Sequence, residues 1–383
     1  MSTALTDLCR HPIVQAPMAG GAARPELVAA VGEAGGLGFL AAGYKTADGM
    51  HEEIKRLRGM TTDRPFGVNL FMPQPPLVDR AAVEAYRERL AGESASYGSP
   101  LGEVSYGSPL DGVSYGSPSA AVDPYGGADD GYEAKLAVLR EDPVPVVSFH
   151  FGCPSRAVFD ALAEVGTYTV VTATTVAEAQ AAEAAGADAV CVQGVEAGGH
   201  QGTHRDDPQA DGTGAGLGLL ALLGQVREAV RVPLIAAGGL MRGSQIAAVL
   251  AAGASMAQLG TAFLATPESG AHPLHKQALT SPLFTHTELT RAFSGRPARG
   301  LVNRFIKEHG HHAPAAYPAV HHLTSGLRKA AAAAGDAQGM ALWAGQGHRM
   351  ARELPAARLV DVLMAELQSA RTALSGGTEG SAS

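Results

Sequence analysis

Eight short apolar segments recur along the chain up to residue 264, and each ends in glycine or a polar residue. Most are near-continuous apolar runs, which is the pattern of strands that are covered on both faces. Segments with helical character separate several of them. The eight segments are Ile13–Met18, Leu37–Gly43, Phe66–Phe71, Val144–Phe151, Tyr168–Thr174, Ala189–Val195, Pro233–Gly238 and Met256–Leu264. This alternation predicts an α/β fold with a parallel sheet, in its simplest form a (β/α)8 TIM barrel, with a doubly wound open sheet as the alternative.

The segments between the apolar runs carry helix start and stop signals. Pro25–Glu33 has proline in its first turn, and two glycines follow shortly after its end. Val176–Ala185 follows two threonines that can cap its N-terminus, and it stops at Gly186. Ser244–Ala252 begins with serine and stops at Gly253. These signals predict helices that cover the sheet.

Two segments interrupt the alternation. Ser96–Pro118 contains the pentapeptide SYGSP three times, with a period of nine residues. A repeat this short and this rich in Gly, Ser and Pro cannot bury a core of its own, which predicts a flexible surface insertion between the third and fourth strands. The alternative is a partner-binding loop with repeated tyrosines. Ser269–Ala330 is rich in His, Pro and Arg, has weak periodicity, and is predicted to form a small cap after the eighth strand.

These features predict how the chain is divided. The predicted parts are a barrel over 1–268 with the insertion at about 94–127, a substrate cap or lid over 269–330, C-terminal helices over 331–373 that pack back on the barrel, and a disordered tail over 374–383. One of the C-terminal helices is expected around Ala356–Ala373.

Charge and composition argue against several classes of function. The net charge is −8 and no block of Lys or Arg occurs, so nucleic acid and anionic membranes are not expected as partners. No apolar run approaches the ~20 residues that span a bilayer, and the N-terminus lacks a signal-peptide pattern. The three cysteines, Cys9, Cys153 and Cys191, lie far apart without metal-ligand spacing. They are expected to be reduced thiols of a cytoplasmic protein.

The predicted strand ends are rich in glycine, and in a barrel the carboxyl ends of the strands carry the function. They are Gln15–Gly21, Val68–Phe71 with Asn69 at the rim, Gln193–His200, Ala236–Leu240 and Ala257–Phe263. Glycine pairs let backbone N–H groups approach a ligand closely, and barrels commonly bind phosphate after strands seven and eight. The candidate phosphate contacts are Gly238, Gly239, Gly260 and Thr261. The alternative is that these glycines only form tight turns.

His200 follows the sixth predicted strand, at the face where a ligand is expected, in a turn that is too rich in glycine to bury it. An imidazole with an ordinary pKa of ~6.5 suits proton transfer at neutral pH. The sequence therefore predicts a general base at His200, with a structural histidine as the alternative.

Several familiar motifs are missing from the sequence. No G-x-G-x-x-G follows the first strand, so a Rossmann dinucleotide site is not indicated. Neither a G-x-S-x-G elbow nor a metal-ligand histidine pair occurs. The adjacent pairs His311–His312 and His321–His322 point in different directions on any regular element, so we interpret them as surface or capping histidines. No metal site is predicted.

Six segments, in order along the chain, together resemble the nitronate monooxygenases, formerly called 2-nitropropane dioxygenases. The segments are PIVQAPMAGG, VNLF, VQGVEAGGHQG, PLIAAGGL, AQLGTAFLATPES and LWAGQG. The similarity covers roughly residues 10 to 370, and the SYGSP segment is the clear departure from the family pattern. The resemblance implies a TIM barrel that binds FMN. It is closest to the class that uses FMN and oxygen without a nicotinamide.

The resemblance also implies roles for individual residues. The implied FMN contacts are Asn69, Gln193, Gly198, Gly238, Gln258, Leu259, Gly260 and Thr261, with Ala16, Pro17 and Met18 along the isoalloxazine. His200 is the implied catalytic base. His150 and Tyr317 are the implied lining of the substrate pocket.

The activity implied by the resemblance is oxidation of an alkyl nitronate, such as propionate 3-nitronate, with O2 to a carbonyl compound and nitrite. His200 either removes the α-proton of a neutral nitroalkane or, when protonated, stabilises a preformed nitronate. One rival is an FMN-dependent NAD(P)H enoyl-ACP or quinone reductase, which has a similar EAGGH turn. Another is a flavin-binding protein without turnover whose tyrosine repeats recruit a partner. A monomer or a homodimer is expected.

Overall fold

Eight parallel strands close into a barrel in the computed structural model, which describes residues 5–61, 64–75, 79–99, 101, 129–206 and 216–376. The strands, in order around the barrel, are β1 (Ile13–Gln15), β2 (Leu37–Ala41), β3 (Phe66–Phe71), β4 (Val146–His150), β5 (Tyr168–Ala173), β6 (Ala189–Gln193), β8 (Leu234–Ala237) and β9 (Met256–Leu259). β9 pairs with β1 and closes the ring. The predicted (β/α)8 barrel is confirmed, and the open sheet is excluded.

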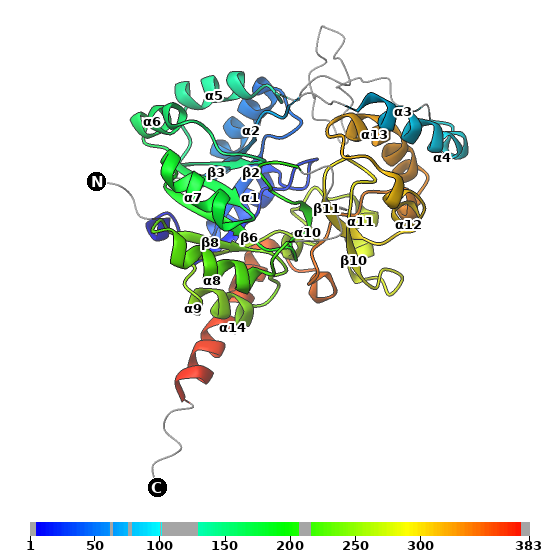
Figure 1. Cartoon of the computed structure of the whole chain (residues 1–383). Coiled ribbons are helices and arrows are strands. Elements are labelled where there is room, and N and C mark those ends of the chain that lie inside the picture. The colour runs from blue at the N-terminus through cyan, green and yellow to red at the C-terminus, as the bar shows by residue number, and fades with distance from the viewer. Residues whose placement is uncertain are drawn as a thin grey trace.

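Helices surround the barrel (Figure 1). They are α1 (Pro25–Glu33), α2 (Ala47–Met60), α5 (Tyr132–Glu141), α6 (Arg156–Glu164), α7 (Val176–Ala185), α8 (Leu219–Ala229) and α9 (Gly243–Ala251). The predicted bounds of α1 and α7 are confirmed, and Thr175 and Glu178 form a capping box at the start of α7. The eighth apolar run is shorter as a strand than predicted, because β9 stops at Leu259 and the short helix α10 (Thr261–Leu264) follows.

The inner face of the barrel changes from apolar to polar toward the carboxyl ends of its strands. On β4, Val146, Ser148 and His150 share the inner face, because alternate residues of a strand point the same way. Val146 belongs to the apolar cluster inside the barrel, whereas Ser148 and His150 line the cavity above that cluster. The same alternation brings polar residues of other strands to this level, namely Asn69, Thr172, Gln193 and Gln258. The amino acid pattern itself thus places a polar site at the barrel mouth.

A cap packs beside the mouth of the barrel (Figure 1). It contains α11 (Pro273–Thr280), α12 (Arg304–His309), α13 (Ala319–Ala333) and an antiparallel sheet in the order β10 (Thr287–Thr290), β11 (Ala298–Leu301), β7 (Gly199–His200). An apolar core holds the cap together, with the rings of Phe293 and Phe305 stacked at 4.6 Å. The predicted cap boundary at residue 330 falls inside α13, so the cap continues past it.

Helices from before the fourth strand also belong with the cap. α3 (Arg80–Arg89) and α4 (Ala91–Tyr97) pack against α13. Glu93 pairs with Arg304 of α12, and the Tyr97 hydroxyl donates to the Asp336 carboxylate at 2.6 Å. The prediction of a flexible insertion from about residue 94 is therefore wrong for its first residues, since the tyrosine of the first SYGSP copy is anchored to the cap. The other two copies lie outside the described residues.

The chain returns to the barrel at its C-terminal end. α14 (Ala356–Gly376) packs on α9 and α1, and it extends past the predicted start of the tail at residue 374. Residues 377–383 lie outside the described part. Four short 3₁₀ turns complete the structure, namely η1 (Leu5–Asp7), η2 (Gly310–His312), η3 (Ala337–Gly339) and η4 (His348–Met350). None of the helices described has the length and apolar character needed to traverse a bilayer.

Candidate functional site

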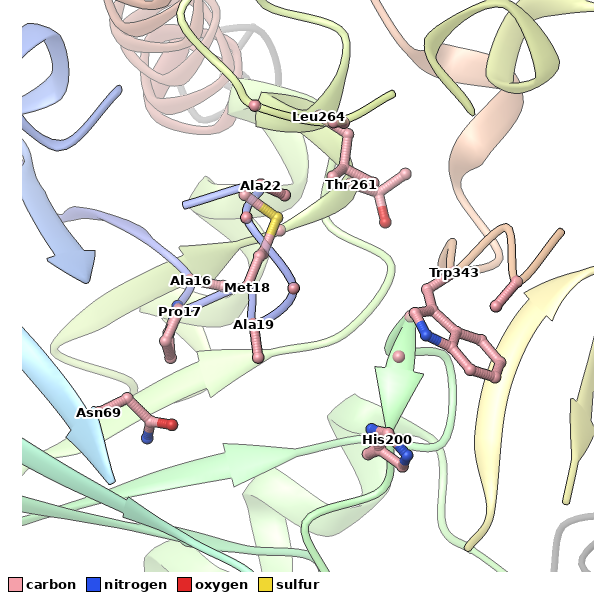
Figure 2. A pocket seen from close by; sticks show the side chains of 18 of the residues that line it. Ala16, Pro17, Met18, Ala19, Ala22, Asn69, His200, Thr261, Leu264 and Trp343 are labelled. Atoms are coloured by element: carbon pink, nitrogen blue, oxygen red, sulfur yellow. The ribbon is translucent and has the colours of Figure 1, made fainter. Parts of the chain in front are cut away.

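A cavity of about 820 Å³ opens between the carboxyl ends of the barrel strands and the cap. Figure 2 shows Pro17, Met18 and Asn69 on one side of it, with His200 and Trp343 facing them from the other. The volume lies within the range of ~300–1,000 Å³ that is usual for ligand pockets. The cavity is therefore large enough for a cofactor and a small substrate together.

Most of the residues predicted for a site line this cavity. They are Ala16, Pro17, Met18, Asn69, His150, Gln193, Gly198, His200, Gly238, Gly239, Gln258, Gly260 and Thr261. Leu259 is not among them, because it alternates with the inward-facing Gln258 and packs in the core outside the barrel, 1% exposed. Tyr317 lies just behind the wall, with its ring 5.6 Å from that of Phe151 and 5.9 Å from that of His200.

Gln193 holds the turn that carries His200. Its side-chain oxygen accepts from the Gly202 N–H at 2.7 Å, and its side-chain nitrogen donates to the His200 carbonyl at 3.2 Å. Both ends of the amide are thus engaged with the turn, so its main contribution to the site is to orient His200. One N–H of this amide is left for a ligand.

His200 is half-buried, contrary to the prediction that its turn could not bury it. The reason is that Gly199 and His200 form the strand β7, which pairs with Arg299 and Ala298 of β11 in the cap. A glycine-rich turn after β6 therefore becomes the edge of a second sheet, and this sheet fixes the imidazole against the cavity.

A serine behind His200 is hydrogen-bonded to one of its two ring nitrogens. His200 Nε2 lies 2.9 Å from Ser294 Oγ, and the single proton of that hydroxyl is donated to the Arg296 carbonyl at 3.1 Å. In this arrangement Ser294 Oγ can accept from Nε2–H, and this tautomer leaves Nδ1 of a neutral imidazole without a proton. His200 is in this way prepared to accept a proton at Nδ1.

The surroundings keep His200 neutral. Burial lowers its pKa to about 3, and the charge of Arg296 and then His150 act in the same direction. Arg296 is 1% exposed, sits 4.1 Å from the centre of the Phe151 ring, and donates to Gln74 at 2.6 Å. Burial and Arg296 likewise lower the pKa of His150 to about 3. An imidazole in this environment is neutral and can accept a hydrogen bond at neutral pH.

Glycines allow the chain to pass close to itself around the cavity. A Cβ on Gly198 would lie 2.4 Å from the Gly345 nitrogen and 2.5 Å from the Ala344 carbonyl carbon. Gly238 and Gly239 have φ values of +135° and +69°, which favour glycine. The Gly345 N–H also donates to the Thr261 hydroxyl at 2.9 Å, so the segment around Trp343 is tied to the end of β9.

Several cavity residues were not singled out from the sequence. Trp343 stands 5.7 Å from the His200 ring, and Tyr44 reaches the cavity from a loop after β2. His321 and His322 of α13 also line the cavity, so interpreting them as surface or capping histidines is wrong. The His321 ring stacks on Tyr44 at 4.3 Å, and burial lowers its pKa well below the ordinary value. Their positions depend on the cap, which has no regular sequence pattern.

The unpaired polar groups in the cavity fit a flavin mononucleotide. Asn69 donates to Ser148 Oγ at 2.9 Å and has no partner for its own oxygen among the described residues, and the Gln258 amide has none at all. Gly20 and Gly199 face open space, with no atom within 4 Å of a Cβ built on either. The Asn69 oxygen and the Gln258 amide, beside open backbone, are suited to a polar heterocycle and its phosphate.

The family model and two similar curated proteins indicate the same family. The family model described as nitronate monooxygenase matches residues 2–366. The chain is 41% identical over 364 residues to a nitronate monooxygenase of Pseudomonas aeruginosa, covering 94% of this chain and 97% of that one. It is 40% identical to a nitronate monooxygenase of Paraburkholderia phytofirmans, covering 93% and 92%.

Solved structures agree on the fold. A nitroalkane oxidase from Streptomyces ansochromogenes is 70% identical with a TM-score of 0.89, covering 97% of this chain and 100% of that chain. FabK from Thermotoga maritima is 28% identical with a TM-score of 0.70, covering 97% and 98%.

Proposed function

Because the chain belongs to the nitronate monooxygenase family, we propose that it is an FMN-dependent enzyme that oxidises alkyl nitronates with O2 to a carbonyl compound and nitrite. The observation that carries this proposal is the imidazole of His200 in the wall of the cavity at the barrel mouth, with its Nε2 2.9 Å from Ser294 Oγ and burial lowering its pKa. Propionate 3-nitronate is the proposed substrate. A cytoplasmic monomer or homodimer stays a prediction.

The cavity residues divide between cofactor and substrate in this proposal. Gly238, Gly239, Gly260 and Thr261 are proposed to hold the phosphate of FMN, and the Asn69 oxygen and the Gln258 amide its polar ring or ribityl groups. Ala16, Pro17 and Met18 would pack along the ring, and Gly198 would let the backbone pass beside it. Bound FMN would accept electrons from the substrate and pass them to O2.

His200 is proposed to act at the reacting carbon. With a neutral nitroalkane, Nδ1 removes the α-proton, and the Nε2–H bond to Ser294 holds the ring in place and stabilises the charge that develops on it. With a preformed nitronate no proton has to be removed, so this role as a base is then not needed. His150 and Tyr317 are proposed to limit the space around His200 and exclude water from it.

The pH dependence of catalysis follows from the lowered pKa of His200. A base whose pKa is about 3 is deprotonated throughout the neutral range and is lost only as the pH falls through that value. We expect kcat/KM for freshly diluted neutral nitroethane to show no ascending limb between about pH 5 and pH 8, since kcat/KM reports groups of the free enzyme. Initial rates in an oxygen electrode measure this. A limb with an apparent pKa of ~6.5 would mean that His200 behaves as an ordinary exposed histidine.

The likeness to FabK supports a second candidate, an FMN-dependent NAD(P)H reductase. The two activities are separated by mixing the purified, FMN-loaded protein with NADH under anaerobic conditions. The proposed oxidation leaves the flavin absorbance unchanged with NADH and bleaches it with propionate 3-nitronate. Rapid bleaching by NADH alone favours the reductase, and a protein that does not take up FMN contradicts both.

A further inference from the structure

One cation in the cavity lacks an acidic partner. Arg328 of α13 lines the cavity, and no carboxylate in the described parts of the chain forms an ion pair with it. Among the described residues, the acids that line the cavity are Glu26 and Glu53. Both are already paired, Glu26 with Arg56 and Glu53 with Lys45 at 2.5 Å. The charge of Arg328 is therefore available to a ligand.

The guanidinium of Arg328 is held in a fixed orientation along the helix. Side chains of a helix lean toward its N-terminus, and Arg328 donates from one terminal nitrogen to the His321 carbonyl at 2.9 Å. Its Nε also lies 3.4 Å from the Thr324 carbonyl. The other terminal nitrogen has no partner within the described residues, so it remains for a ligand in the cavity.

The Arg328 guanidinium lines the same cavity as His200. The guanidinium contacts His321, whose ring stacks on that of Tyr44. The His321 ring lies 6.5 Å from the Tyr317 ring, and Tyr317 neighbours His200. The charge of Arg328 contributes to lowering the pKa of His200. Burial lowers the pKa of Arg328 itself to about 10, which keeps it charged at neutral pH. The contacts of Arg328 are with its own helix and not with the glycine turns after β8 and β9.

We propose that Arg328 anchors a second anionic group of the substrate, so that the site selects nitronates with a carboxylate a few carbon atoms from the reacting carbon. The inference rests on the proposed function and adds to it the residue that binds the carboxylate of the proposed substrate. Guanidinium groups bind carboxylates through directed, charge-assisted hydrogen bonds, and a cation partly removed from water gains more from such a partner than an exposed one does. The nitronate end lies at His200 and the carboxylate end at Arg328.

The test compares two substrates of similar size, propionate 3-nitronate and butyl 1-nitronate, which differ in the charge of the distal end. In Arg328→Gln, the ratio of kcat/KM for the charged over the uncharged substrate should fall by about 10- to 100-fold, the range expected for one charge-assisted hydrogen bond. Arg328→Lys should retain part of the preference. Lys307→Gln is the matched control, because it removes one positive charge from an exposed position of the cap outside the cavity and should leave the ratio unchanged.

A binding measurement separates this inference from the proposed function. Succinate, a dicarboxylate that cannot be oxidised here, is titrated into the FMN-loaded protein while the flavin absorbance or the fluorescence of Trp343, the single tryptophan, is followed. Its dissociation constant should rise by about tenfold or more in Arg328→Gln and not in Lys307→Gln. If no nitronate is oxidised, the proposed function fails while succinate still tests the anchor. An unchanged ratio and unchanged succinate binding, or loss of FMN from Arg328→Gln, would overturn the inference.

Discussion

His200→Asn should lower the turnover of neutral nitroalkanes by about 10²- to 10⁴-fold, the usual contribution of a general base. Asparagine keeps a side chain of similar polarity in the cavity wall but cannot accept the α-proton at Nδ1. Turnover of the matching preformed nitronate should fall much less, because no proton has to be removed. The measurement is oxygen uptake with nitroethane and with its nitronate, under the same conditions and on protein loaded with the same amount of FMN.

Ser294→Ala should lower nitroalkane turnover less than His200→Asn does. It removes the acceptor of His200 Nε2–H, so the imidazole loses the bond that fixes its tautomer but keeps its basic nitrogen. Nitroalkane turnover should fall by about tenfold, the effect of one hydrogen bond, and Ser294→Thr should restore part of it. An equal loss with nitroalkane and nitronate in His200→Asn would contradict the role as base.

Gly198→Ala should have the second large effect, which is to lower both the stability of the protein and its affinity for FMN. The new methyl group would meet the Ala344 and Gly345 backbone at about 2.5 Å, so one of the two backbone segments would have to shift. We expect a loss of about 1–3 kcal/mol in the free energy of unfolding, typical of overpacking, together with weaker FMN binding. Thermal unfolding and a flavin titration measure the two effects.

Gly59→Ala is the matched control for Gly198→Ala. Gly59 is exposed in α2, and a Cβ there has no atom within 4 Å. Alanine should stabilise this helix by about 0.5–1 kcal/mol and leave FMN binding unchanged. If Gly198→Ala unfolds and binds FMN like the native protein, the close passage of the two backbones is not a requirement of the site.

The barrel was predictable because its strands are buried on both faces and leave an apolar run in the sequence for each strand. The caps of α7 and the polar ends of β3, β6 and β9 are local signals in the same way. Leu259 does not line the cavity, and a run of letters does not show which residues of a strand face inward. Only the alternation of inward-facing and outward-facing positions along β9 distinguishes Leu259 from Gln258.

The cap side of the site was not predictable by the same means. Trp343, His321 and Arg328 come from segments without strong periodicity, and they reach the cavity through packing between elements distant in sequence. The burial of His200 likewise depends on the pairing of β7 with β11, about a hundred residues further on. The tyrosine of the first SYGSP copy gave no local sign that it would contact Asp336. Long-range contacts of this kind leave little trace in a single sequence.

The account is tested most directly by oxygen uptake of the purified, FMN-loaded protein with propionate 3-nitronate, with nitrite measured in the same sample. We predict rapid oxygen consumption with release of nitrite, at a rate that does not change when NADH is added. Oxygen consumption that requires NADH, or none at all with nitronates of any chain length, would contradict the proposal.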